Sequence, residues 1–83
     1  MGKKLIWNDK AKAHLRAIDQ ATALSILKAL ARFLATGEGD VKTLQGIDPP
    51  EQRLRVGEYR VLFHDLGDAI EVVSVKHPRE AYR

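Results

Sequence analysis

The stretch RLRVGEYRVLFH, residues Arg53–His64, decides the fold because apolar and polar residues alternate along most of its length. On both sides of Gly57-Glu58 an apolar side chain stands at every second position, which is the rhythm of a β-strand with one buried face. A two-residue break that begins with glycine is typical of a tight hairpin turn. The stretch therefore predicts two neighbouring antiparallel strands.

The polar positions of this hairpin are rich in positive charge. In an antiparallel pair, residues on one face lie about 5 Å apart across the strands, so the basic positions of both strands are expected on one surface. Guanidinium groups at that distance repel one another, and an anion such as a phosphate between them relieves the repulsion. The sequence thus predicts a polyanion-binding surface, with a solvated basic face as the alternative. The residues are Arg53, Arg55, Arg60 and His64.

Before the hairpin, the sequence predicts one strand and two helices. Residues 4–7 form a short apolar run that ends at Asn8-Asp9, a pair suited to capping the start of a helix. Apolar residues then recur at helical spacing from Asp9 to Ile18. They recur again from Gln20 to about Thr36, and Asp19 is suited to capping this second helix. The two helices are expected to form an antiparallel hairpin.

The remaining segments complete an α+β fold. Gly37 and Gly39 are expected to end the second helix. Residues 43–46 then lead to residues 47–50, whose two prolines mark a surface loop. After the Arg-rich hairpin, residues 69–75 are β-branched and apolar, as a central strand should be, and Pro78 ends them. The expected order is one strand, a two-helix hairpin and a three-stranded antiparallel meander, with the helices on one face of a small, mostly antiparallel sheet.

Length and composition limit the class of protein. A chain of 83 residues is expected to form one domain, residues 1–83. It contains no cysteine, which excludes disulfides and thiolate zinc sites, and a formal charge of +3 favours an acidic partner. The longest apolar stretch, residues 29–35, is interrupted by Arg32 and is too short to span a bilayer. We expect a cytoplasmic protein without a membrane partner.

The order of elements, the run RLRVGEYRV at residues 53–61 and the ending HPREAYR at residues 77–83 resemble the RelE/ParE superfamily of bacterial and archaeal toxins. The resemblance is closer to the RelE branch, covers nearly the whole chain, and is most specific in the Gly-x-Tyr-Arg hairpin and the basic segment with its tyrosine. It implies a RelE-like toxin of a type II toxin–antitoxin system that enters the ribosomal A site and cuts mRNA. A cognate antitoxin would hold the toxin inactive in a hetero-oligomer.

RNA cleavage through its own 2′-hydroxyl needs a base, cations that stabilise the charged phosphorane, and a donor for the leaving 5′-oxygen. It requires neither a metal nor another cofactor. The resemblance implies that Arg60 binds the scissile phosphate, supported by Arg53 and Arg55. It also implies that the ring of Tyr82 stacks on a base while the hydroxyl orients the 2′-oxygen.

Other positions have more than one interpretation. His77 or Lys76 stands where RelE-like enzymes place a basic proton donor or charge stabiliser, and the sequence leaves both open. Arg79 and Arg83 are expected to contact the substrate phosphates. Glu51 replaces a lysine of the best-known members. Some relatives use a carboxylate base there, whereas its place after two prolines also allows a loop residue.

The remaining histidines are expected to be structural or solvated: His64 paired with Asp65 or facing water, and His14 on a helix surface. Pro78 departs from the family pattern, which usually has a basic residue there. Two other functions are compatible with the same fold. One is a ParE-like toxin that poisons DNA gyrase, and the other is a catalytically silent relative that only binds an antitoxin or structured RNA.

Overall fold

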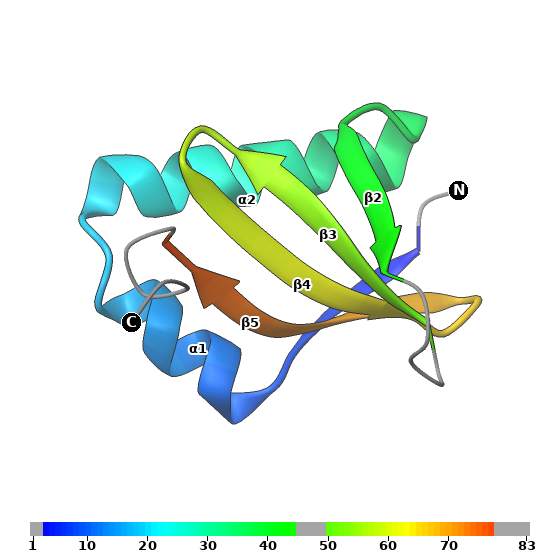
Figure 1. The fold of residues 1–83 in the computed structure, drawn as a ribbon, viewed down its shortest axis with the longest axis horizontal. Helices are drawn as coiled ribbons and strands as arrows, with labels where there is room; N and C mark the ends of the chain where they lie inside the picture. Colours follow the sequence, from blue (N-terminus) through cyan, green and yellow to red (C-terminus); the bar gives the residue numbers. More distant parts are fainter. Residues whose placement is uncertain (1–2, 45–49, 78–83) are drawn as a thin grey trace.

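The computed structural model describes residues 3–44 and 50–77, which form two helices and one five-stranded sheet (Figure 1). The strands lie in the order β1-β5-β4-β3-β2, with β1 parallel to β5 and every other pair antiparallel. The predicted α+β architecture is therefore confirmed. The elements are β1 (Lys4–Trp7), α1 (Asp9–Arg16), α2 (Gln20–Thr36), β2 (Asp40–Leu44), β3 (Glu51–Val56), β4 (Tyr59–Asp65) and β5 (Ala69–Lys76).

The helix boundaries follow from local capping. The Asn8 side chain accepts a hydrogen bond from the backbone N–H of Ala11 at 2.8 Å, and Asp19 accepts one from Thr22 at 3.0 Å. Both bonds satisfy amide groups that have no partner inside the first turn of a helix. Gly37 ends α2 in the left-handed conformation, with φ of 76°. The sequence predicted α2 correctly, whereas α1 ends at Arg16, before the predicted Ile18.

The strand β2 is a correction, because the sequence predicted three strands after the helices and the described residues form four. Thr43 and Leu44 belong to β2, which pairs with β3 in a register that runs from Asp40 opposite Arg55 to Leu44 opposite Glu51. Five residues between glycines and prolines are too few for alternation to stand out, and the pairing with β3 is a tertiary contact. Residues 45–49, which include most of the loop predicted at residues 47–50, lie outside the described residues.

The core lies between one face of the sheet and the two helices. Its largest enclosed side chain is Phe63 of β4, whose ring centroid is 5.5 Å from that of Phe33 in α2. In Figure 1 the strands β2, β3 and β4 cross in front of α2, and α1 lies beside β5. No described helix is long and apolar enough to cross a membrane. The buried apolar residues are Ala11, Ile26, Leu30, Leu54, Val61, Phe63, Ile70, Val72 and Val75.

His14 closes an edge of the sheet, which corrects its predicted place on the helix surface. β1 pairs with β5 only as far as Val72, so on the side away from β4 the next part of β5 has no described strand beside it. There α1 packs against β5, and the half-buried His14 accepts the backbone N–H of Val75 on Nδ1 at 3.1 Å. The imidazole thereby replaces the carbonyl of a missing neighbouring strand. Residue pattern alone could not reveal this contact, because it joins residues far apart in the chain.

Asp65 ties the turn after β4 to the amino-terminal segment. The Lys3 Nζ atom lies 2.7 Å from both carboxylate oxygens, and the Gly67 N–H donates to Oδ1 at 3.0 Å. The hydrogen bond from Lys3, followed by that from Gly67, lowers the pKa of Asp65 below its ordinary value of 3.8. The ionised form is therefore favoured in the folded state.

We expect Asp65→Asn to lower the free energy of unfolding at neutral pH, but by less than about 1 kcal/mol, because both side chains are more than a third exposed. A lowered folded-state pKa adds stability above the unfolded pKa of about 3.9, and this contribution is lost as the pH falls through the folded value. Urea unfolding at about pH 7 and about pH 2 measures this difference. An equal effect of the substitution at both pH values would contradict the expectation.

Candidate functional site

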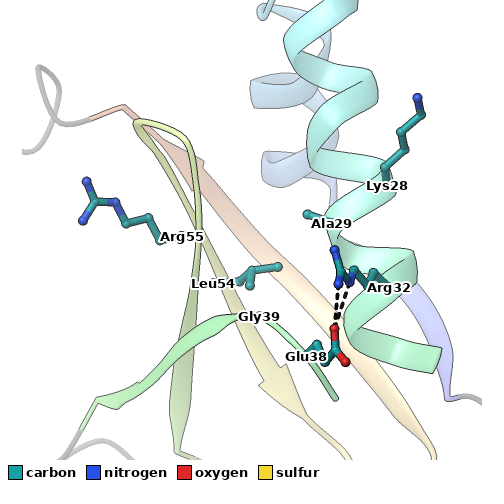
Figure 2. Close-up of a pocket in the computed structure, with 7 residues that line it drawn as sticks. All are labelled: Lys28, Ala29, Arg32, Glu38, Gly39, Leu54 and Arg55. Atoms are coloured by element: carbon teal, nitrogen blue, oxygen red, sulfur yellow. Dashed lines mark hydrogen bonds and ion pairs between the residues drawn. The ribbon is translucent and has the colours of Figure 1, made fainter. Parts of the chain in front are cut away.

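The Arg side chains of the hairpin lie on the face of the sheet that points away from the helices, which we call the open face. Figure 2 shows the alternation directly: Leu54 points toward α2, and Arg55, the next residue of β3, points to the opposite side of the strand. Leu54 is 1% exposed and packs in the core, whereas Arg55 is exposed. In β4, Val61 is likewise buried and Arg60 belongs to the open face. The predicted gathering of basic residues on one surface is confirmed.

The pairing register orders the open face into three rows that run across the strands. Successive rows are two residues apart along a strand, or about 6.6 Å, and neighbours within a row lie about 5 Å apart. The hairpin row comprises Asp40, Arg55, Arg60 and Lys76. The middle row comprises Lys42, Arg53, Leu62 and Ser74. The far row comprises Leu44, Glu51, His64, Glu71 and Ile6.

The hairpin row concentrates positive charge. Arg55 is directly opposite Arg60, and Arg60 is directly opposite Lys76 on β5. Like charges in opposite positions destabilise a sheet, and Asp40 beside Arg55 offsets only part of this repulsion. The guanidinium Nε of Arg55 donates to the carbonyl of Gly57 at 3.3 Å, which holds the group at the turn. Such an arrangement is suited to binding an anion.

The middle row adds two cations and a buried hydroxyl. Arg53 lies between Lys42 on β2 and Leu62 on β4, so two basic side chains stand side by side here as well. Lys42 was not among the predicted site residues, because it reaches this row only through β2, which the sequence did not predict. The Ser74 hydroxyl is enclosed and has no hydrogen-bond partner among the described residues. The positive region therefore extends from the hairpin row onto the middle row.

The far row differs in chemistry, because carboxylates flank its histidine. Glu51 begins β3 and is not a loop residue, which settles the alternative left open by the sequence. His64 is opposite Glu51 on one side and Glu71 on the other. The Nε2 atom of His64 lies 3.4 Å from Oε2 of Glu51, so its acidic partner is Glu51 and not the predicted Asp65 or solvent. Register across strands, which sequence adjacency does not reveal, sets this pairing.

The structure separates the two candidates that the sequence left open for the proton donor. Lys76 lies on the open face, opposite Arg60. His77 lies on the helix side, where its ring centroid is 5.1 Å from that of Tyr59 and its Nε2 atom is 3.1 Å from Oε2 of Glu58. Lys76 is thus brought to the Arg cluster and the His77 ring is not. Of the other predicted substrate contacts, Arg79, Tyr82 and Arg83 lie outside the described residues.

Residues 5–82 match the family model described as the ParE toxin of the type II toxin-antitoxin system parDE. The chain belongs to the ParE toxin family. This toxin family is part of the RelE/ParE superfamily predicted from the hairpin and the basic ending, so that prediction is confirmed. Among curated protein sequences, none matches the toxin significantly.

Solved structures of toxins have the same fold. The RelB–RelE antitoxin–toxin complex from Methanococcus jannaschii contains a chain that is 20% identical, with a TM-score of 0.77, covering 93% of this toxin and 94% of that chain. A chain of the YoeB dimer from Staphylococcus aureus is 15% identical, with a TM-score of 0.74, covering 93% of this toxin and 98% of that chain. A chain of the chromosomal ParDE system from P. aeruginosa is 18% identical, with a TM-score of 0.65, covering 90% of this toxin and 95% of that chain. At such identities the likeness shows the fold alone.

The toxin also has a cleft of about 430 Å³ between α2 and β3 (Figure 2). Gly39 fits its floor because an added Cβ would lie 2.9 Å from a methyl group of Leu54. On the rim, Arg32 donates from Nε and Nη2 to Oε2 of Glu38 at 3.1 and 2.7 Å. Lys28 points away from this ion pair in Figure 2. The cleft therefore combines an apolar floor with a basic rim, and because Arg55 also lines it, the cleft adjoins the hairpin row of the open face.

Proposed function

We propose that this toxin is a ribosome-dependent endoribonuclease that cuts mRNA through the RNA 2′-hydroxyl, without a metal ion. The observation that carries the proposal is the pairing of Arg55 with Arg60 on an open face, with Lys76 and Arg53 in neighbouring positions. Such a cluster can hold a phosphate and stabilise the additional charge of a phosphorane. Within reach of the same surface, Glu51 and His64 supply groups that can accept a proton.

The rows suggest how the reaction is arranged. In-line displacement places the attacking and leaving oxygens on opposite sides of the phosphorus. A phosphate over Arg53 in the middle row has Glu51 in the far row on one side and Lys76 in the hairpin row on the other. The far and hairpin rows are about 13 Å apart along a strand, a distance that two long side chains and the reacting group can bridge.

In this arrangement Glu51 takes the proton of the 2′-hydroxyl while the 2′-oxygen bonds to phosphorus. Arg60, supported by Arg55, binds the phosphate oxygens through its guanidinium group. The bond from phosphorus to the 5′-oxygen breaks, and the ammonium of Lys76 gives this oxygen a proton. The products are a 2′,3′-cyclic phosphate and a 5′-hydroxyl end. In this proposal Tyr82 stacks on a base of the RNA. Arg79 and Arg83 contact neighbouring phosphates.

We also propose an antitoxin partner. The similar RelE chain was solved as an antitoxin–toxin complex, and the basic surfaces of this toxin are suited to an acidic polypeptide. The open face would be neutralised by acidic residues of the partner. The floor of the cleft includes Ala29 and Leu54, and its rim includes Arg32. An apolar side chain of the antitoxin, flanked by acidic residues, would fit this cleft. The expected complex is a hetero-oligomer in which the site is covered.

The test is cleavage of a defined mRNA by purified toxin on programmed ribosomes, followed by mapping of the new ends. We expect cuts inside the A-site codon with 2′,3′-cyclic phosphate and 5′-hydroxyl ends, unchanged by a metal chelator. Mixing with the antitoxin should abolish the cuts. Ribosome binding without any cut would contradict the enzyme assignment and support the catalytically silent alternative.

A second candidate function is favoured by the match to the ParE family model. The ParE branch, as the resemblance implies, poisons DNA gyrase and leaves RNA intact. Production of the toxin in a bacterial host separates the two candidates. Trapped gyrase cleavage complexes and a DNA damage response with full-length messages would support the gyrase target, whereas shortened messages without DNA damage support the ribonuclease.

A further inference from the structure

Glu51 and His64 form a cross-strand pair that is more enclosed than an open sheet face requires. They are opposite each other in the register of β3 and β4, and their closest charged atoms, Oε2 and Nε2, are 3.4 Å apart. The side chains are only 20% and 21% exposed. A glutamate on a solvated strand normally samples several rotamers, so this contact restricts the carboxylate.

The imidazole also has an unsatisfied atom. Nε2 of His64 is enclosed, yet it makes no hydrogen bond with any described residue. A buried polar atom without a partner is costly and calls for an explanation. Nε2 already lies 3.4 Å from Oε2 of Glu51, so a small shift and rotation of either side chain would give the two atoms hydrogen-bond geometry. An ordinary core position would be filled more favourably by an apolar side chain, so the pair points to a function.

The location of the pair indicates which function. Glu51 is two residues before Arg53 on the same strand and face, one row away from the cations. His64 lies beside Glu51 in the far row, on β4, so its ring is diagonal to Arg53 and two rows from Arg60. Glu71 on β5 flanks His64 on its other side. Its carboxylate is in the same row as Glu51, but it lies two strands from β3, the strand that carries Arg53.

We propose that His64 is a positioning residue for Glu51. The imidazole N–H donates to Oε2 and fixes the carboxylate, and Oε1 is left to accept the proton of the RNA 2′-hydroxyl. The inference rests on the proposed ribonuclease function and adds a second residue to its proton-accepting group. His64 acts through Glu51 in this proposal and transfers no proton itself. A fixed carboxylate avoids the loss in rate that follows from a small misplacement of a catalytic group.

The experiment measures kcat and KM for cleavage on programmed ribosomes with wild-type toxin and a set of variants. We expect His64→Leu to lower kcat about 10-fold to 100-fold with KM unchanged, because only the orientation of the base is lost. His64→Gln should retain most of the activity, since its amide N–H can still donate to Glu51. In a Glu51→Gln background, His64→Leu should cause no further loss. Glu71→Gln is the matched control and should leave kcat unchanged.

Thermal unfolding of each variant separates this effect from a loss of structure, and His64→Ala replaces His64→Leu if the leucine variant does not fold. Wild-type kcat in a folded His64→Leu or His64→Ala variant overturns the inference. An independent loss in the Glu51→Gln background also overturns it, because His64 would then act without Glu51. Absence of cleavage by the wild-type toxin overturns the ribonuclease proposal itself, and the inference with it.

Discussion

Arg60→Ala is expected to reduce mRNA cleavage on ribosomes about 100-fold or more without destabilising the protein. Removal of one preorganised donor to a charged transition state typically costs about 100-fold to 1,000-fold in rate. Arg60 stands between Arg55 and Lys76 in the hairpin row, so it has cations on both sides. Because like charges opposite each other destabilise a sheet, loss of this guanidinium should leave the melting temperature equal or slightly higher.

The matched control is Arg16→Ala, which removes the same charge from an exposed position at the end of α1. It should leave cleavage unchanged, which separates a local role of Arg60 from an effect of net charge. Arg60→Lys keeps the charge and loses the two-pronged geometry, so an intermediate rate is expected. An equally active and equally toxic Arg60→Ala protein would remove Arg60 from the site.

Phe63→Ala is expected to lower the free energy of unfolding by about 3 to 5 kcal/mol, the usual cost of deleting a buried phenylalanine ring. Phe63 is completely buried in β4, and its ring contacts that of Phe33 on α2 at a centroid distance of 5.5 Å. At about 0.05 to 0.15 kcal/mol per residue, a chain of this length has about 4 to 12 kcal/mol in total. The substitution therefore removes much of the stability, and we expect partial unfolding near 37 °C.

Urea unfolding followed by circular dichroism measures this change. Leu66→Ala is the control, because Leu66 is 51% exposed in the turn after β4, and its loss should cost less than about 0.5 kcal/mol. Phe63→Leu should fall between the two, since most of the apolar volume remains. A cost below about 1 kcal/mol for Phe63→Ala would mean that the sheet and α2 do not depend on this ring contact.

The hairpin was predictable because its two faces differ in chemistry at every second residue. Alternation places Leu54 and Val61 in the core, and it therefore assigns Arg55 and Arg60 to the same open surface without any further information. The same alternation of faces separates Lys76 from His77 once β5 is known to continue to residue 76. The strand pattern in the sequence extends only to Val75, one residue short of Lys76, so both candidates stayed open.

Other features depend on contacts that no local pattern encodes. The short strand β2 exists because β3 offers it a partner, and Lys42 reaches the middle row only through that pairing. The contact between Glu51 and His64 depends on the register of two strands, and the bond from Val75 to His14 depends on where β1 stops. Residue type and spacing predict the chemistry of each of these side chains. Their contacts are set by neighbours that lie far away in the sequence.

The parallel pairing of β1 with β5 has a consequence for synthesis of the toxin. Lys4 is aligned with Ala69 and Trp7 with Val72, so β1 cannot pair until residues 69–72 have been synthesised. Contacts between such distant segments slow folding. In a nascent chain without β5, β4 lacks its partner on one side, and α1 lacks the strand against which it packs. The native sheet can therefore close only after β5 has been made, and the open face gains Lys76 beside Arg60 at that same late stage.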